Sequence, residues 1–110
     1  MPLATQMAAS AGATVYSVVS SEEKVALAYE AGATEVFFYS DNLAEDVRRR
    51  NGGVGVDVVY DGVGKATFNE SLEAVRPRGT VCLFGAASGP VDPIDPQVLN
   101  THGSIFLTRP

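Results

Sequence analysis

Apolar and polar residues follow two alternating patterns along this chain. Short β-branched and aromatic runs are typical of strands, and they fall at residues 13–19, 34–39, 56–61, 79–85 and 103–110. Longer amphipathic segments with acidic residues early and basic residues or glycine late predict helices at 20–32, 40–53, 65–77 and 96–100. The segment 86–96 carries three prolines and is predicted to be a loop. Alternating strands and helices indicate a single α/β domain whose parallel sheet is covered on both faces.

Several residues mark the expected helix ends. Ser20 and Glu23 have the spacing of a capping box, and Gly32 stands where the same helix should end. Ser40 or Asp41 is expected to cap the next helix. The arginines at 48–50 close that helix in the order that complements its dipole, so we interpret them as a solvated helix end rather than an anion site.

The first residues have a helical spacing, with Leu3, Met7 and Ala11 on one side and Gly12 as the end. A parallel α/β domain normally opens with a strand followed by a glycine-rich turn, and neither precedes this segment. We therefore expect the chain to begin just inside the first helix of its domain. In the usual strand order the missing strand is central, so the strands ending at Val19 and Tyr60 would each lack a neighbour.

Composition narrows the possible functions. The chain has 110 residues, of which 45% are hydrophobic and 19% charged, and this is enough for one core. A net charge of −5 argues against nucleic acid as a partner. No apolar run approaches the roughly 20 residues of a membrane span, and no export leader is visible. A single cysteine, Cys82, and a single histidine, His102, cannot make a structural zinc site. We expect a buried thiol, a solvent-facing imidazole and a reducing cytoplasm.

The segment "GVGKAT" from Gly62 to Thr67 follows a strand and opens a helix, as a dinucleotide-binding turn would. It has the first two glycines of G-x-G-x-x-G, with Thr67 in place of the third. The fingerprint also needs an acidic residue after the next strand, and that strand ends in Phe84, Gly85 and Ala86. We favour a tight turn here, with a ligand-contacting loop as the alternative. The glycines of residues 52–57 precede a strand and indicate only a helix end. Neither segment is predicted to cradle a pyrophosphate.

Three motifs together resemble one family: "YDGVG" at 60–64, "LFGAASGPV" at 83–91 and "GSIFLTRP" at 103–110. The sequence is similar to the quinone oxidoreductases related to zeta-crystallin, a zinc-independent branch of the medium-chain dehydrogenase/reductase superfamily. The resemblance implies a Rossmann-type, doubly wound, mainly parallel sheet that here lacks its first strand and glycine-rich turn. It also implies an NADPH cofactor and hydride transfer to a quinone or an α,β-unsaturated carbonyl. On this basis residues 1–110 are part of an NADPH-binding domain, without the catalytic domain and without catalytic residues of their own.

The expected binding site for the 2′-phosphate of NADPH lies after the first predicted strand. That strand ends at Ser20, where an NAD-selective domain carries a carboxylate that binds the ribose. Hydroxyl groups at a helix N-terminus and a nearby cation suit a phosphate instead. The resemblance assigns phosphate binding to Lys24 and an aromatic partner to Tyr39, with Ser20 and Ser21 beside them. The alternative for Lys24 is an ordinary surface lysine paired with an adjacent glutamate.

The remaining cofactor contacts are expected at the ends of two later strands. Asp61 and Gly62 end a strand at the same edge of the sheet, beside the adenosine side of the crevice. The resemblance implies that Phe84 and Gly85 place backbone along the nicotinamide ribose. A glycine permits such close approach of backbone to a ligand. From the sequence alone, Phe84 is equally well explained as a core residue.

The terminal segment Gly103–Pro110 is a flat, apolar strand, and an exposed strand edge can pair with another chain. The resemblance implies a homodimer, which we expect to form through Ile105, Phe106 and Leu107. Two other functions stay open: a non-enzymatic dinucleotide-binding or regulatory module, and a structural fragment that binds nothing.

Overall fold

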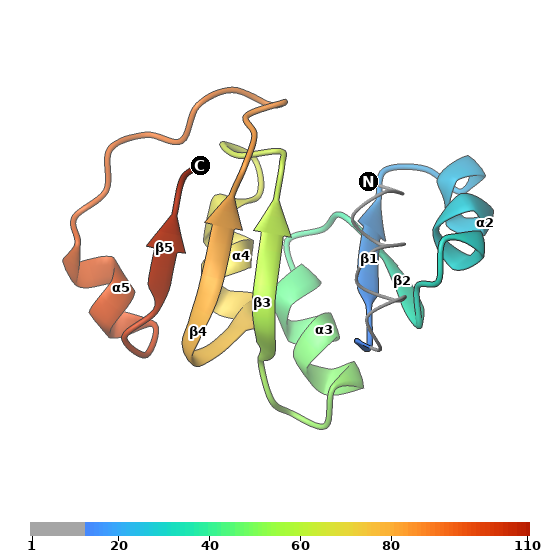
Figure 1. The fold of residues 1–110 in the computed structure, drawn as a ribbon, viewed down its shortest axis with the longest axis horizontal. Coiled ribbons are helices and arrows are strands. Elements are labelled where there is room, and N and C mark those ends of the chain that lie inside the picture. Colours follow the sequence, from blue (N-terminus) through green and yellow to red (C-terminus); the bar gives the residue numbers. More distant parts are fainter. Residues whose placement is uncertain (1–12) are drawn as a thin grey trace. The chain divides into compact units, whose positions relative to one another are not determined.

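The computed structural model describes residues 13–110, which divide into two compact units (Figure 1). The N-terminal unit ends at Leu43, and the C-terminal unit comprises Ala44–Pro110. Each unit is described by itself. The helix predicted before Gly12 lies outside the described residues.

The N-terminal unit is a parallel βαβ arrangement. Strands β1 (Tyr16–Val19) and β2 (Glu35–Phe38) are joined through helix α2 (Glu23–Glu30), and Val19 lies opposite Phe38 in the ladder. The buried core is small and consists of Val19, Ala28 and Ala33. Since two of these three side chains are single methyl groups, little apolar surface stabilises this unit.

The predicted capping box of α2 is wrong. The N-cap residue is Glu22, it has helical backbone angles, and its side chain makes no capping hydrogen bond. Ser20 lies outside the helix, and its hydroxyl oxygen accepts a hydrogen bond from Lys24 Nζ at 3.1 Å. The predicted helix end is confirmed, because Gly32 has a φ of +106°, which favours glycine.

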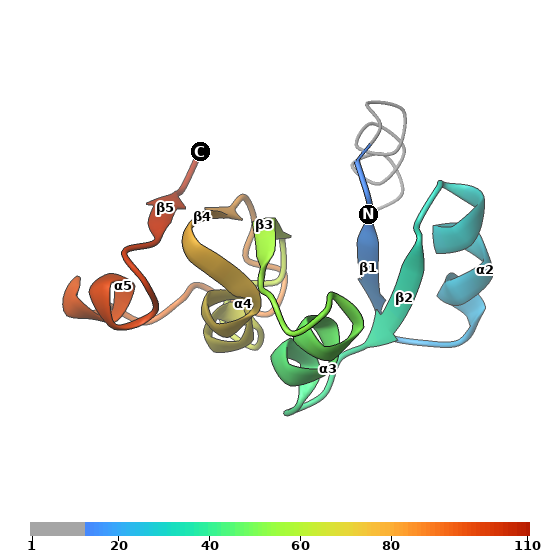
Figure 2. The same cartoon turned by 90° about the horizontal axis from the view of Figure 1, so that it is seen from below.

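The C-terminal unit contains a three-stranded parallel sheet of β3 (Val56–Asp61), β4 (Val75–Leu83) and β5 (Phe106–Thr108), in that order. Helix α4 (Phe68–Ala74) joins β3 to β4, and α5 (Gln97–Thr101) precedes β5. Figure 2, in which the strands are seen nearly end-on, shows α4 and α5 on the same side of the sheet. Among the described residues no ladder joins this sheet to the sheet of the N-terminal unit.

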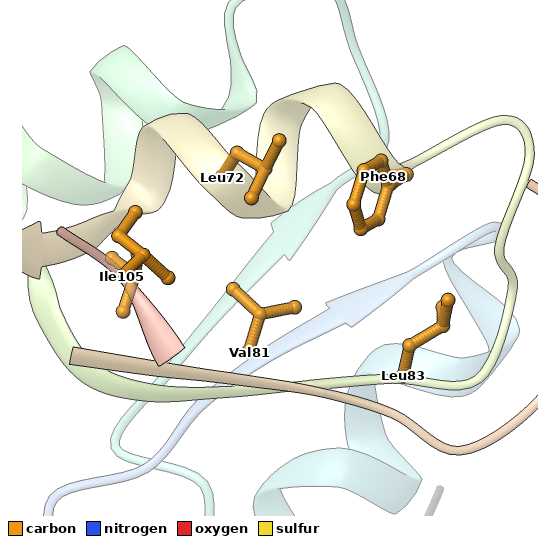
Figure 3. Close-up of a cluster of buried hydrophobic side chains, with 6 residues drawn as sticks. Phe68, Leu72, Val81, Leu83 and Ile105 are labelled. Atoms are coloured by element: carbon orange, nitrogen blue, oxygen red, sulfur yellow. The ribbon is translucent and has the colours of Figure 1, made fainter. Parts of the chain in front are cut away.

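The core of this unit lies between α4 and the sheet (Figure 3). Leu72 of α4 and Val81 of β4 are fully buried, and Ile105 closes the cluster from the start of β5. Val98 and Leu99 of α5 pack against the same cluster. Burial of several large aliphatic groups, each worth about 1.5–3 kcal/mol, gives this unit its main stabilisation.

The opposite face of the three strands carries exposed side chains. Tyr60 and Phe106 are 65% and 64% exposed, and Val58 is also exposed. These residues alternate along β3 and β5 with the core residues, as the two faces of a pleated strand require. Within the C-terminal unit the expectation of a sheet covered on both faces is therefore not met.

The start of β4 differs from the prediction, which extended the preceding helix to Pro77. The structure ends α4 at Ala74, and Val75 has the extended backbone of a strand. The residue before a proline is disfavoured in the helical region, so Arg76 cannot continue the helix. Pairing with β3 shifts between Val75 and Thr80, and Arg78 within this irregular stretch has a φ of +58°.

Helix α3 (Leu43–Arg50) packs on α4 through polar contacts. The Ala44 amide donates to Glu70 at 2.9 Å, and Arg48 donates to the carbonyls of Glu73 and Val75 at 2.7 and 3.0 Å. These carbonyls at the end of α4 would otherwise lack an intrahelical partner. The expectation of a solvated helix end is therefore met only in part. Arg49 is exposed and pairs with acidic residues of its own helix, whereas Arg48 bonds the end of α4. No helix in the described part of the chain is long and apolar enough to cross a membrane.

Candidate functional site

The turn that follows β3 is closed by internal hydrogen bonds. Each backbone N–H from Val63 to Phe68 has an acceptor within the chain: Asp61 Oδ1 for residues 63 and 64, Gly89 O for 65, Ser88 Oγ for 66, and Gly64 O for 67 and 68. A phosphate-binding turn needs such N–H groups to point at the ligand. The prediction that this segment is not a pyrophosphate cradle is confirmed.

The Asp61 carboxylate is the centre of that turn. It is only 4% exposed and accepts hydrogen bonds of 2.8–3.0 Å from the amides of Val63 and Gly64 and from the hydroxyls of Thr67 and Ser71. Thr67, which replaces the third glycine of the fingerprint, therefore has an internal role. Asp61 was expected beside the adenosine side of the crevice, and the structure directs its carboxylate into the protein, where it is held by internal donors.

A second loop, after β4, lies directly on the first. Ala87 N donates to Gly62 O at 3.1 Å, Ser88 N to Val63 O at 2.8 Å, and the Ser88 hydroxyl to the same Val63 carbonyl at 2.7 Å. The Phe84 amide donates to Asp61 O at 3.0 Å. We call residues 62–67 and 84–89 together the double loop. It forms the carboxyl-end edge of the sheet of this unit, where parallel α/β sheets bind ligands.

Glycines allow the two loops to approach this closely. A Cβ added to Gly64 would lie 2.8 Å from Gly89 O, and one added to Gly85 would lie 2.8 Å from Gly62 O. At Gly62 the added atom would meet the Phe84 ring at 2.7 Å. The sequence suggested that Gly85 leaves room for a ligand, whereas the structure shows that Gly62, Gly64 and Gly85 first leave room for the facing loop.

The residues expected around the 2′-phosphate gather at the carboxyl end of the N-terminal sheet. Because Val19 pairs with Phe38, Ser20 and Tyr39 leave neighbouring strands at the same edge. Lys24 donates to Ser20, as described, and among the described residues it forms no ion pair with the glutamates at 22 and 23. Ser21 contributes its carbonyl to the first turn, where it accepts from Lys24 N at 3.2 Å. Tyr39 is 43% exposed.

Each unit thus brings its own predicted residues together. Four residues received no role from the sequence: Gly64, Thr67 and Ser88, which bond within the double loop, and Ser71, which donates to Asp61 from helix α4. An aspartate followed by glycine is a known signal for a side chain that bonds the backbone two residues on, so the bond from Val63 N to Asp61 could have been found. Ser88 gives no such local signal, because its partners are more than 20 residues away.

The cysteine and the histidine have structural surroundings. Cys82 is a free thiol on β4, opposite Tyr60 and Thr108 in the ladders, and it is half-buried where a buried thiol was expected. His102 is half-buried rather than solvent-facing, and its Nδ1 lies 2.8 Å from the Val98 carbonyl. Among residues 13–110 no group of His, Cys, Asp and Glu side chains is arranged to hold a metal ion.

Comparison with known proteins identifies the family. Residues 2–108 match the family model described as zinc-binding dehydrogenase. The 2-haloacrylate reductase of a Burkholderia species is 48% identical over 90% of this chain and 30% of its own length. A mycobacterial protein solved in complex with NADPH has a TM-score of 0.96 and 50% identity over 99% of this chain and 35% of that one. The Escherichia coli quinone oxidoreductase, also solved with NADPH, has a TM-score of 0.93 and 37% sequence identity, over 99% of this chain and 34% of its own.

The chain therefore spans about a third of the length of the proteins it matches. The mixed α/β fold with parallel strands agrees with the Rossmann-type nucleotide-binding domain expected from the sequence. The family match covers nearly the whole chain, and relatives named quinone oxidoreductase cover it equally well. The protein belongs to the zinc-binding dehydrogenase family of the medium-chain dehydrogenase/reductases, in its quinone oxidoreductase branch.

Proposed function

We propose that this chain is the cofactor-binding part of an NADPH-dependent oxidoreductase that transfers hydride to a quinone or an α,β-unsaturated carbonyl. The observation that carries the proposal is the Ser20–Lys24 pair at the carboxyl end of β1. It puts a hydroxyl and an ammonium group where a domain selective for NADH would keep a carboxylate. Two structurally similar proteins were solved with NADPH, which supports the same cofactor here.

In this proposal the N-terminal unit recognises the 2′-phosphate. Lys24 supplies the positive charge, and the hydroxyls of Ser20, Ser21 and Tyr39 supply donors around it. Lys24 is exposed and is held by a neutral hydroxyl rather than a carboxylate, so its charge is not neutralised before a phosphate arrives. Tyr39 follows β2 at the same edge and is 43% exposed, and its phenol is proposed as a further donor.

The C-terminal unit binds the remainder of the cofactor through the double loop. Gly62, Phe84 and Gly85 are half-buried, so part of their backbone is left to face a ligand. NADPH, when bound, supplies the hydride and so carries the redox chemistry. The contribution of this chain is to bind the cofactor and hold its orientation, and no residue of the chain is assigned a proton-transfer step. Zinc independence of the reaction remains a prediction.

Titration of the chain with NADPH and with NADH tests the proposal. Lys24→Ala should reduce the preference for NADPH over NADH about tenfold or more, because a charge-assisted hydrogen bond is worth about 1.5–3 kcal/mol. Arg49→Ala is the matched control, since it removes one exposed positive charge on helix α3 and should leave the preference unchanged.

The outcomes separate the candidate functions. An unchanged preference in Lys24→Ala would contradict the phosphate assignment. A chain that binds neither dinucleotide would be the structural fragment. Binding by a full-length protein that reduces neither quinones nor enones would identify the non-enzymatic module.

We also propose a homodimer formed through the edge strand β5. In the C-terminal unit β5 pairs on one side with β4 and stands last in the sheet. Ile105 is buried in the unit's own core, which excludes its side chain from the expected contact. The strand backbone and the exposed Phe106 are left to form it. Light scattering at micromolar concentration should give twice the chain mass, and a monomer would overturn this part.

The free thiol of Cys82 agrees with a reducing cytoplasm.

A further inference from the structure

We propose that Asp61 is a positioning residue for cofactor binding: its buried carboxylate fixes the double loop in the shape that Phe84 and Gly85 need to receive the ligand. This inference rests on the proposed function. It differs from a direct role in binding, because the carboxylate points into the protein.

The bonding of Asp61 suits such a role. A buried carboxylate is costly unless hydrogen bonds compensate for its lost hydration. Here the donors are all neutral, and the two oxygens accept from different parts of the chain. Oδ1 accepts from the amides of Val63 and Gly64, while Oδ2 accepts from the Ser71 hydroxyl. Thr67 donates to both oxygens. Oδ1 thus shapes the first loop, and Oδ2 ties it to helix α4.

The first loop then determines the position of the second. Once the amides of Val63 and Gly64 are fixed, the carbonyls of Gly62 and Val63 point at the second loop. Those carbonyls accept from the amides of Ala87 and Ser88. The Asp61 carbonyl itself accepts from Phe84 N. Hydrogen bonds therefore run from the buried carboxylate through the first loop to Ala87 and Ser88, and the main chain of Asp61 holds Phe84 at the other end of the same second loop.

The chemistry of the side chain makes the inference testable by conservative replacement. An asparagine at position 61 keeps one oxygen for the amides of Val63 and Gly64. Its NH₂ group can donate to the hydroxyls of Thr67 and Ser71, which can turn to accept. An alanine keeps none of these bonds and leaves the buried Gly64 amide and the part-buried Val63 amide without acceptors.

The experiment measures NADPH and NADH affinity of the chain together with amide hydrogen exchange in the absence of ligand. Asp61→Ala should weaken both dinucleotides at least tenfold and leave their ratio unchanged, because the groups that select the phosphate are elsewhere. Exchange of the Ala87 and Ser88 amides should accelerate even without ligand. Asp61→Asn should stay within about threefold of the unaltered affinity, with normal exchange at both amides.

Two further variants keep the test decisive. Ser71→Ala removes a donor to Oδ2 only, so it should lower stability and leave both affinities unchanged. If Asp61→Ala does not fold, Ser88→Ala serves instead, since it removes the exposed tie from Ser88 to Val63 O and should weaken both dinucleotides about fivefold.

If Asp61→Ala and Ser71→Ala lose dinucleotide affinity equally, Asp61 acts only through stability and the inference is overturned. Normal amide exchange at residues 87 and 88 in Asp61→Ala would overturn it as well. If Ser88→Ala is the variant used, unchanged affinity for both dinucleotides would also overturn the inference. If the unaltered chain bound no dinucleotide at all, the proposed function would fail and this inference with it. If the unaltered chain binds the dinucleotides and Asp61→Ala binds them with the same affinity, only the role of Asp61 is refuted.

Discussion

The carboxyl ends of the strands are built differently in the two units. After β1 and β2 the chain presents side chains: Lys24 and Tyr39 are exposed, and the Lys24 amine donates to the Ser20 hydroxyl. After β3 and β4 it presents backbone, which is fixed by a buried carboxylate and by hydrogen bonds between two loops. One end offers functional groups that a ligand can engage, and the other offers a rigid surface.

This difference determines how each end should respond to mutation. Exposed side chains can be exchanged at little cost to folding, because they touch few neighbours. Closely packed backbone cannot, because any added atom must displace the facing loop. Selectivity between cofactors should therefore be adjustable in the N-terminal unit without loss of stability. In the C-terminal unit affinity and stability should change together, except at Ser71, which lies outside the two loops and bonds Oδ2 rather than the oxygen that accepts from the loop amides.

The largest effect is expected at Gly64. Gly64→Ala would force a φ of +86° on alanine and place its Cβ 2.8 Å from Gly89 O. We expect the free energy of unfolding to fall by about 3 kcal/mol, of which roughly 1–2 kcal/mol is the backbone conformation. Gly52→Ala is the matched control, since Gly52 has a φ of +70° but no atom within 4 Å of the added Cβ. It should lose only about 1 kcal/mol.

Urea denaturation followed by circular dichroism measures both variants. The difference between them reports the contact between the loops, apart from the cost of the left-handed backbone. Equal losses in the two variants would show that the double loop is not closely packed, and the contrast between the units would disappear.

A smaller effect is expected at Tyr39. Tyr39→Phe removes one phenolic donor and should weaken NADPH binding about fivefold, or roughly 1 kcal/mol, while NADH binding and stability stay unchanged. Tyr60→Phe is the control, because it removes the same group from the exposed face of the C-terminal sheet. Isothermal titration calorimetry with each dinucleotide separates the two. An equal loss for NADH would mean that Tyr39 contacts a part of the cofactor other than its phosphate.

Much of the fold could be predicted because its signals are local. The β-branched runs locate all five described strands, and Gly32 locates a helix end. The errors arose where a distant group changed a local preference. Ser20 was assigned to a cap but bonds Lys24, and Arg48 was assigned to solvent but bonds the end of α4. The helix predicted to reach Pro77 stops three residues earlier, although the proline itself was a usable signal.

By itself the sequence determined the order of strands and helices, the family resemblance and the set of residues near the two strand ends, since these depend on periodicity and motifs. Only the tertiary structure decided what those residues do. It turned the Asp61 carboxylate inward, assigned the close approaches of Gly62, Gly64 and Gly85 to facing loops, and brought Ser88 onto Val63. For the glycines and Ser88 the physical reason is that the facing atoms and hydrogen-bond partners come from segments more than 20 residues away, which no local pattern encodes. The donors to Asp61 lie within ten residues of it, and the folding of the turn onto helix α4 brings them to the carboxylate.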